Sequence, residues 1–145
     1  MSDISRPDSA GLALTPGRLA ILAPYAVVLW ALAWTTIHFR GPAGAFLGTQ
    51  GVVTYALTVP LTILINWLHL KLARLPATEI VDAVAVTLAV ATTIDGVCIG
   101  FFPQAYGVDD ATLRHGVAWI LWAGAVACYL AFRTRVRALR VIRRS

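Results

Sequence analysis

The residue whose chemistry is hardest to reconcile with its surroundings is an acid inside an apolar stretch, Asp95 in TTIDGVCIGFF, residues 92–102. On insertion scales a charge at the centre of a bilayer costs about 2.5–3.5 kcal/mol, so an intramembrane carboxylate is a candidate for proton or cation exchange. Two structural explanations stay open beside this one. The carboxyl group can hydrogen-bond to a hydroxyl of a neighbouring helix, or it can face water that reaches in from the outside.

A second set of polar residues repeats at steps of three and four positions, which keeps its members on one face of a helix. Unpaired hydroxyl, amide and imidazole groups are unfavourable in hydrocarbon, so this face must lie against protein or water. We favour hydrogen bonding between helices, at about 0.6 kcal/mol per contact, and keep a polar conduit or binding cleft as the alternative. Pro60, in the middle, lacks an N–H and should bend the helix. This polar face consists of Tyr55, Thr58, Thr62, Asn66 and His69.

A simple depth rule pairs these groups across two helices. If the second and third helices run antiparallel around a turn near residue 75, residues whose numbers sum to about 151 share a depth. The rule predicts His69 within hydrogen-bond or one-water reach of Asp82, and Asp95 near the hydroxyl groups of the polar face. Asp82 lies in the first turns of its helix, near solvent and the positive helix end, where a structural role is sufficient.

The composition predicts that these residues lie in a membrane. Apolar and aromatic residues make up 59% of the 145-residue chain, charged residues 13%, and the mean hydropathy is +0.75. Four segments have the roughly 20 apolar residues that a spanning helix needs, and none has the period-2 alternation of a membrane barrel strand. We therefore predict an all-α polytopic bundle of four transmembrane helices in residues 18–132. The spans are about 19–39, 52–70, 80–102 and 117–132, between a flexible lead of residues 1–17 and an Arg-rich tail of residues 133–145.

Local signals mark where the helices begin. Thr15 followed by Pro16 is typical of a helix start, Thr78 is a candidate N-cap for the third helix, and Asp109 or Asp110 can cap the fourth. The first apolar run is longer than the hydrophobic part of a signal peptide, although Ala43–Ala45 resembles a cleavage site. We expect this run to be retained as a helix.

The distribution of basic residues predicts the orientation. With four spans, ten Lys and Arg residues fall on one side and two on the other, which places both termini in the cytoplasm by the positive-inside rule. The two are Arg40 and Arg114; the ten are Arg6, Arg18, Lys71, Arg74, Arg133, Arg135, Arg137, Arg140, Arg143 and Arg144. In the tail, Arg133, Arg137, Arg140 and Arg144 follow helical spacing and are expected to contact anionic lipid headgroups or a partner protein.

Small and aromatic residues suggest how the helices pack. Ala89, Thr93, Gly96 and Gly100 form a small-residue track that permits close packing, within the chain or between two copies. Cys98 and Cys128 differ in depth and are interpreted as small buried side chains without a disulfide or metal. The five tryptophans are interpreted mainly as interfacial anchors, with a base-stacking or cofactor wall as the alternative: Trp30, Trp34, Trp67, Trp119 and Trp122.

At IDGVCIGFFPQAYG, residues 94–107, the chain resembles small four-helix bacterial inner-membrane proteins of unknown function. The resemblance covers the third helix and its exit turn, and it implies no activity. No zinc motif, phosphate-binding loop, nucleophile elbow or dinucleotide fingerprint occurs, so we expect no enzyme, no cofactor and no metal.

Two functions remain. The first is an oligomeric carrier or permeation protein for protons, cations or small solutes, in which a homodimer encloses a path, Asp95 exchanges the ion and the polar face relays it. The second is a non-transporting membrane subunit or assembly factor whose basic tail binds lipid or a partner. Either would lie in the bacterial inner membrane, and neither implies nucleic acid as a ligand.

Overall fold

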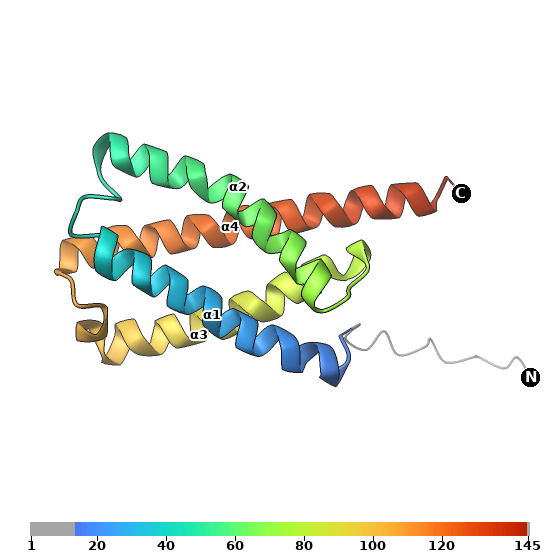
Figure 1. The fold of residues 1–145 in the computed structure, drawn as a ribbon, viewed down its shortest axis with the longest axis horizontal. Coiled ribbons are helices and arrows are strands. Elements are labelled where there is room, and N and C mark those ends of the chain that lie inside the picture. Colours follow the sequence, from blue (N-terminus) through green and yellow to red (C-terminus); the bar gives the residue numbers. More distant parts are fainter. Residues whose placement is uncertain (1–13, 145) are drawn as a thin grey trace, which may run out of the picture.

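The computed structural model describes residues 14–144 of the chain, and in these residues every regular element is helical. The all-α prediction is thus confirmed, and the four long helices form an elongated bundle (Figure 1). Two short 3₁₀ turns lie in the connections. The elements are α1 (Pro16–Arg40), α2 (Gly48–Leu72), η1 (Ala77–Glu79), α3 (Ile80–Phe101), η2 (Pro103–Tyr106) and α4 (Asp110–Ile142).

All four helices are long and apolar enough to cross a membrane. With 25 residues each, α1 and α2 extend over about 37 Å at 1.5 Å per residue, against a hydrocarbon core of about 30 Å. With 33 residues, α4 reaches about 50 Å and continues through most of the Arg-rich tail. Its C-terminal part extends past the other three helices (Figure 1).

The helix starts agree with two of the three sequence signals. Thr15 is the extended N-cap of α1 with Pro16 at the first helical position. The Asp109 carboxylate caps α4, because it accepts hydrogen bonds from Thr112 N at 2.9 Å and Thr112 Oγ1 at 2.7 Å. The prediction that Thr78 caps α3 was wrong, because Thr78 lies inside η1 and α3 begins after Glu79 without a side-chain cap.

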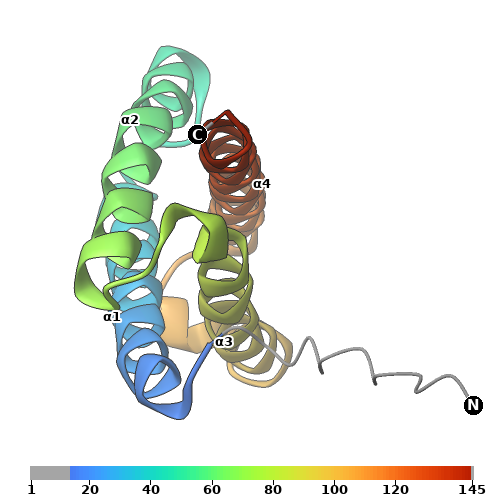
Figure 2. The same ribbon diagram turned by 90° about the vertical axis from the view of Figure 1, so that its right-hand side faces the viewer.

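The helices do not pack in chain order. α1 packs mainly against α3, and α2 mainly against α4, while α3 and α4 also contact each other extensively. Seen from the end, α1 and α2 lie on one side of the bundle and α3 and α4 on the other (Figure 2). The contact between α2 and α3 is smaller. The depth rule assumed that these two helices are close neighbours, and neither of the two side-chain pairings that it predicted is formed.

On α2 the polar side chains face the interior of the bundle and large apolar side chains face outward, while the other helices also bury apolar residues such as Leu22, Ile37 and Ile80. The buried residues of α2 are Gly51 and four members of the polar face, whereas Leu57 and Val52 on the same helix are 61% and 70% exposed. In water this arrangement would lose the apolar burial that drives folding. In lipid it is favourable, because the apolar side chains meet hydrocarbon and the polar ones meet each other.

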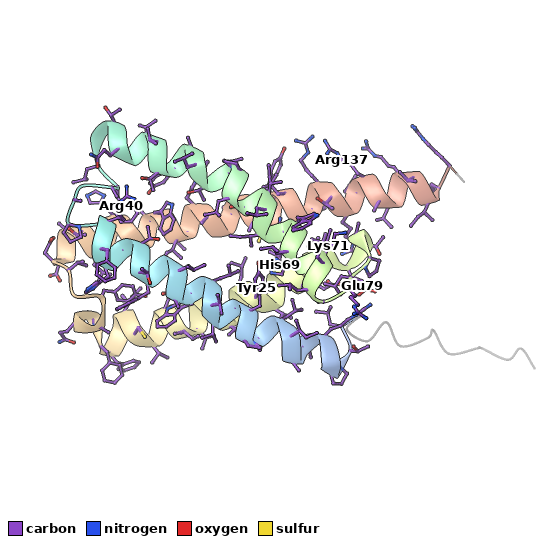
Figure 3. The ribbon with its side chains drawn as sticks, viewed as in Figure 1. Tyr25, Arg40, His69, Lys71, Glu79 and Arg137 are labelled. Atoms are coloured by element: carbon purple, nitrogen blue, oxygen red, sulfur yellow. The ribbon has the colours of Figure 1, made fainter. Side chains whose placement is uncertain are left out.

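The four long helices run back and forth along the bundle, so α1 starts and α4 ends at the same end of it (Figure 1). Lys71, Glu79 and Arg137 lie toward this end, and Arg40 lies at the opposite end (Figure 3). Arg18 pairs with Glu79 here, which ties the first turn of α1 to η1.

Candidate functional site

Asp95 lies inside the bundle, with 8% of its surface exposed. Its Oδ1 atom accepts a hydrogen bond from Trp30 Nε1 at 2.9 Å and a second from the Tyr106 hydroxyl. Tyr106 is fully buried. We expected Asp95 near hydroxyl groups of the polar face; this partner assignment was wrong, because α3 faces α1 at this depth and not α2.

The exit turn after α3 carries Tyr106 back onto the bundle. Gly107 ends η2 with φ = 64°, and a Cβ there would stand 2.5 Å from the His38 ring, so glycine suits both the turn and the close approach. Two residues of α1 hold the turn by its backbone: Trp34 Nε1 donates to the Ala105 carbonyl at 2.9 Å, and His38 Nδ1 donates to the Tyr106 carbonyl at 2.7 Å.

Trp30, Trp34, His38, Asp95 and Tyr106 therefore form one hydrogen-bonded group, which we call the Asp95 clasp. It joins α1, α3 and η2. Burial, and then the hydrogen bond to Asp95, raise the pKa of the Tyr106 phenol, so this group stays a neutral donor. The second oxygen of the carboxyl group, Asp95 Oδ2, accepts no hydrogen bond from the residues described.

The polar face is buried as expected of groups that avoid lipid. Thr58, Thr62, Asn66 and His69 are each at most 6% exposed, and Tyr55 is half-buried. Most of their hydrogen bonds lead to other helices or to their own helix backbone. Trp119 Nε1 of α4 donates to Thr58 Oγ1 at 2.8 Å, and Asn66 Nδ2 donates to the Ala127 carbonyl of α4 at 3.2 Å.

His69 is paired inside the bundle, not with Asp82. Its Nδ1 donates to the Ile65 carbonyl at 2.9 Å, and its Nε2 lies 2.8 Å from Thr87 Oγ1 of α3. Tyr25 of α1 packs edge-on against the ring at 4.8 Å between centroids (Figure 3). Asp82 is half-buried in the first turn of α3 and makes no hydrogen bond or ion pair with the residues described.

The small-residue track faces outward. Ala89, Thr93, Gly96 and Gly100 are all exposed, and a Cβ built on either glycine would meet nothing within 4 Å. The expected packing of this track within the chain is therefore absent from the described structure. Pro60 is exposed inside α2, which remains one continuous helix.

The arginines of the tail lie on a helix that leaves the bundle. Arg133, Arg137 and Arg140 line a shallow hollow on α4 together with Tyr129 and Phe132, and the Arg133 guanidinium lies 5.8 Å from the centre of the Tyr129 ring. Within residues 14–144 the ion pair found is Arg18–Glu79, at the start of α1. The basic side chains of α4 thus have no acidic partner in the described chain.

Sequence reasoning missed the donors of these sites: Trp30, Tyr106, Thr87 and Trp119. We interpreted the tryptophans as interfacial anchors, yet Trp30 and Trp119 donate to buried oxygens. A signal existed, since a buried indole N–H or phenol O–H needs an acceptor and acceptors are scarce in apolar helices. Which tryptophan meets which oxygen depends on helix neighbours, which a single sequence does not define.

Among residues 14–144, no cluster of three His, Cys, Asp or Glu side chains could hold a metal ion. Cys98 and Cys128 are free thiols, half-buried and exposed respectively, so the expectation that both are buried was wrong. In comparisons with known proteins, no family model, curated protein or solved structure matches this chain. Its function must be argued from the geometry alone.

Proposed function

We propose that the chain is an integral membrane protein whose four helices all cross the bacterial inner membrane, with both termini in the cytoplasm. The supporting features are the outward apolar side chains of α2 and the uneven distribution of basic residues. Nine of the Lys and Arg residues in the described chain belong to the end where α1 starts and α4 stops, against Arg40 and Arg114 at the other.

Within the membrane, the protein acts as a non-transporting subunit that presents a basic helical arm. This proposal rests on the hydrogen bonds of the polar groups inside the bundle. Nearly all of these groups hydrogen-bond to a neighbouring helix or to their own helix backbone. Groups held in this way stabilise the bundle, whereas a conduit needs groups left free to bind its solute. Asp95 is then a structural acceptor that fixes η2 to α1.

The arm is the part of α4 from Arg133 to Ile142, and its ligand is the anionic lipid headgroup. Six arginines and no acidic residue occur between residues 133 and 145. Near an anionic membrane surface each basic side chain contributes about 1 kcal/mol to binding. Val136 and Leu139 give the arm apolar contacts with the outer part of the acyl chains.

Charge-neutral variants at opposite ends of the bundle test the arm. Arg137→Gln with Arg140→Gln removes two charges from the arm, and Arg40→Gln with Arg114→Gln removes two from the other end. Native mass spectrometry of protein released from phosphatidylglycerol-containing nanodiscs counts the bound anionic lipids. We expect a severalfold loss for the arm variant and none for its control. Equal retention by both variants would contradict the proposal.

A carrier that exchanges ions at Asp95 is the second candidate. The observation that favours it is Asp95 Oδ2, which accepts no hydrogen bond in the described chain and so is available to a proton or cation. One chain has few helices to surround a path, so this function would require a homodimer. The exposed small-residue track of α3 offers a face for it.

Flux measurements in liposomes distinguish the two functions. A carrier gives proton or alkali-cation flux above that of protein-free vesicles, and Asp95→Asn abolishes it because an amide cannot ionise. A subunit gives no flux with either protein. Size-exclusion chromatography of both proteins in detergent checks that the substitution leaves the assembly intact.

A further inference from the structure

Asn66 has a buried oxygen without a partner. The residue is 6% exposed. Among the described residues, its Oδ1 is the one fully buried side-chain nitrogen or oxygen that makes no hydrogen bond. The side-chain nitrogen donates to the Ala127 carbonyl of α4. Turning the amide over would not help, because Oδ1 would then face that carbonyl and two acceptors would meet.

The neighbouring groups on α2 cannot supply the missing hydrogen. Thr62, one helical turn away, donates its hydroxyl hydrogen to the Thr58 carbonyl at 2.7 Å. Thr58 donates to the Thr54 carbonyl at 2.8 Å, and His69 Nδ1 donates to the Ile65 carbonyl. The hydroxyl hydrogens of Thr58 and Thr62 and the Nδ1 hydrogen of His69 are therefore committed to backbone oxygens.

What remains on this part of the polar face is a set of oxygen lone pairs. Thr62 Oγ1 accepts no hydrogen bond in the described structure, and it shares a helix face with Asn66 Oδ1 through their spacing of four residues. Both side chains are buried. These two acceptors lie inside a bundle with an apolar exterior and receive no hydrogen bond. They are therefore complementary to a small molecule or ion that donates hydrogen bonds.

We propose that Thr62 Oγ1 and Asn66 Oδ1 form the acceptor side of a buried site for a small hydrogen-bond donor, either water or a monocation of the ammonium class. Both ligands offer several hydrogens on a compact centre. An ion such as tetramethylammonium has the charge but no N–H, so it does not satisfy these oxygens. The site is separate from the basic arm and from the Asp95 clasp.

Nuclear magnetic resonance of the full chain in phosphatidylcholine nanodiscs tests the site, with the Asn66 side-chain amide protons as the probe. A bound water gives cross-relaxation between water and these protons. An ammonium site gives a saturable shift of their signals on addition of ammonium chloride, and tetramethylammonium chloride gives none. Either result supports the proposal and identifies the ligand; the absence of both overturns it.

Two matched variants test the part played by Thr62. Thr62→Val removes the hydroxyl oxygen and should reduce the ligand-dependent signal of Asn66 severalfold. Thr93→Val removes a hydroxyl with the same kind of bond, to the Ala89 carbonyl at 2.7 Å, from the exposed face of α3, and should leave the signal unchanged. An unchanged signal in Thr62→Val would overturn the two-oxygen site.

Discussion

At the scale of single residues, buried oxygens and the few donors that reach them define this protein. Asp95 accepts hydrogen bonds from Trp30 and Tyr106, and Thr58 accepts one from Trp119. A buried polar group that loses its partner costs more than the bond itself contributed, because the remaining group cannot return to water. Substitutions at these donors should therefore reduce stability more than substitutions at exposed aromatic residues.

Tyr106→Phe is the most direct test of this argument. The change removes one hydroxyl and leaves Asp95 with Trp30 as its single donor. Hydrogen bonds to a charged group contribute about 1.5–3 kcal/mol in soluble proteins and polar contacts in membranes somewhat less, so we expect a loss of about 1–2 kcal/mol. The free energy of unfolding in mixed detergent measures the loss. Tyr129→Phe, at a site 59% exposed, should change it little.

At the scale of elements, caps and close helix contacts decide where each segment lies. The Asp109 carboxylate holds the first turn of α4 through Thr112, and those hydrogen bonds lower its pKa below the ordinary value. A carboxyl group with a lowered pKa in the folded state stabilises the fold above its unfolded pKa. That contribution is lost as the pH falls through the folded pKa.

Asp109→Asn should therefore show a pH-dependent defect. Asparagine is also a good N-cap but carries no charge for the positive helix end. We expect the wild type to be more stable than the variant at neutral pH, and the difference to disappear as the pH falls below about 4. Thermal unfolding in detergent across this range measures it. A difference that does not change with pH would show that charge has no part in the cap.

Two glycines provide a matched test of helix packing. A Cβ on Gly51, at the start of α2, would stand 2.7 Å from the backbone carbonyl group of Phe46, so Gly51→Ala must displace the preceding loop. Overpacking of this kind costs about 1–3 kcal/mol. Gly96→Ala meets open space and should be neutral or stabilising by up to about 1 kcal/mol, because alanine favours helix. Unfolding in mixed detergent should rank the two in this order.

The helices and the buried face of α2 could be predicted from the sequence because they depend on local periodicity. Thr58, Thr62, Asn66 and His69 share a face by spacing alone, and the structure buries all four. The partners of Asp95 could not be predicted, since they depend on α1 packing against α3 and on the exit turn that returns Tyr106 to the bundle. The side-chain partner of His69 does lie on α3, but it is Thr87 and not Asp82. Chain order suggested α2 as the neighbour of α3, and a single sequence contains no signal that corrects this choice.

At the scale of the whole molecule, the surface and the charge distribution support the proposed place of the protein in a bilayer. Leu57, Val52 and Phe101 are more than 60% exposed, as expected if lipid covers them. Arg137 lies on the part of α4 that extends past the other three helices (Figures 1 and 3), where the proposed orientation would place lipid headgroups and water.

The orientation can be measured by labelling in intact cells with a thiol reagent that does not cross membranes. Ala105 is exposed in η2, and its side chain makes no hydrogen bond, so Ala105→Cys should leave the turn intact. In a background of Cys98→Ala and Cys128→Ala, we expect labelling of Ala105→Cys and none of Ser145→Cys. Both should react after the cells are permeabilised, which controls for thiol reactivity. Labelling of Ser145→Cys in intact cells would reverse the proposed orientation and place the basic arm outside, where the positive-inside rule disfavours it.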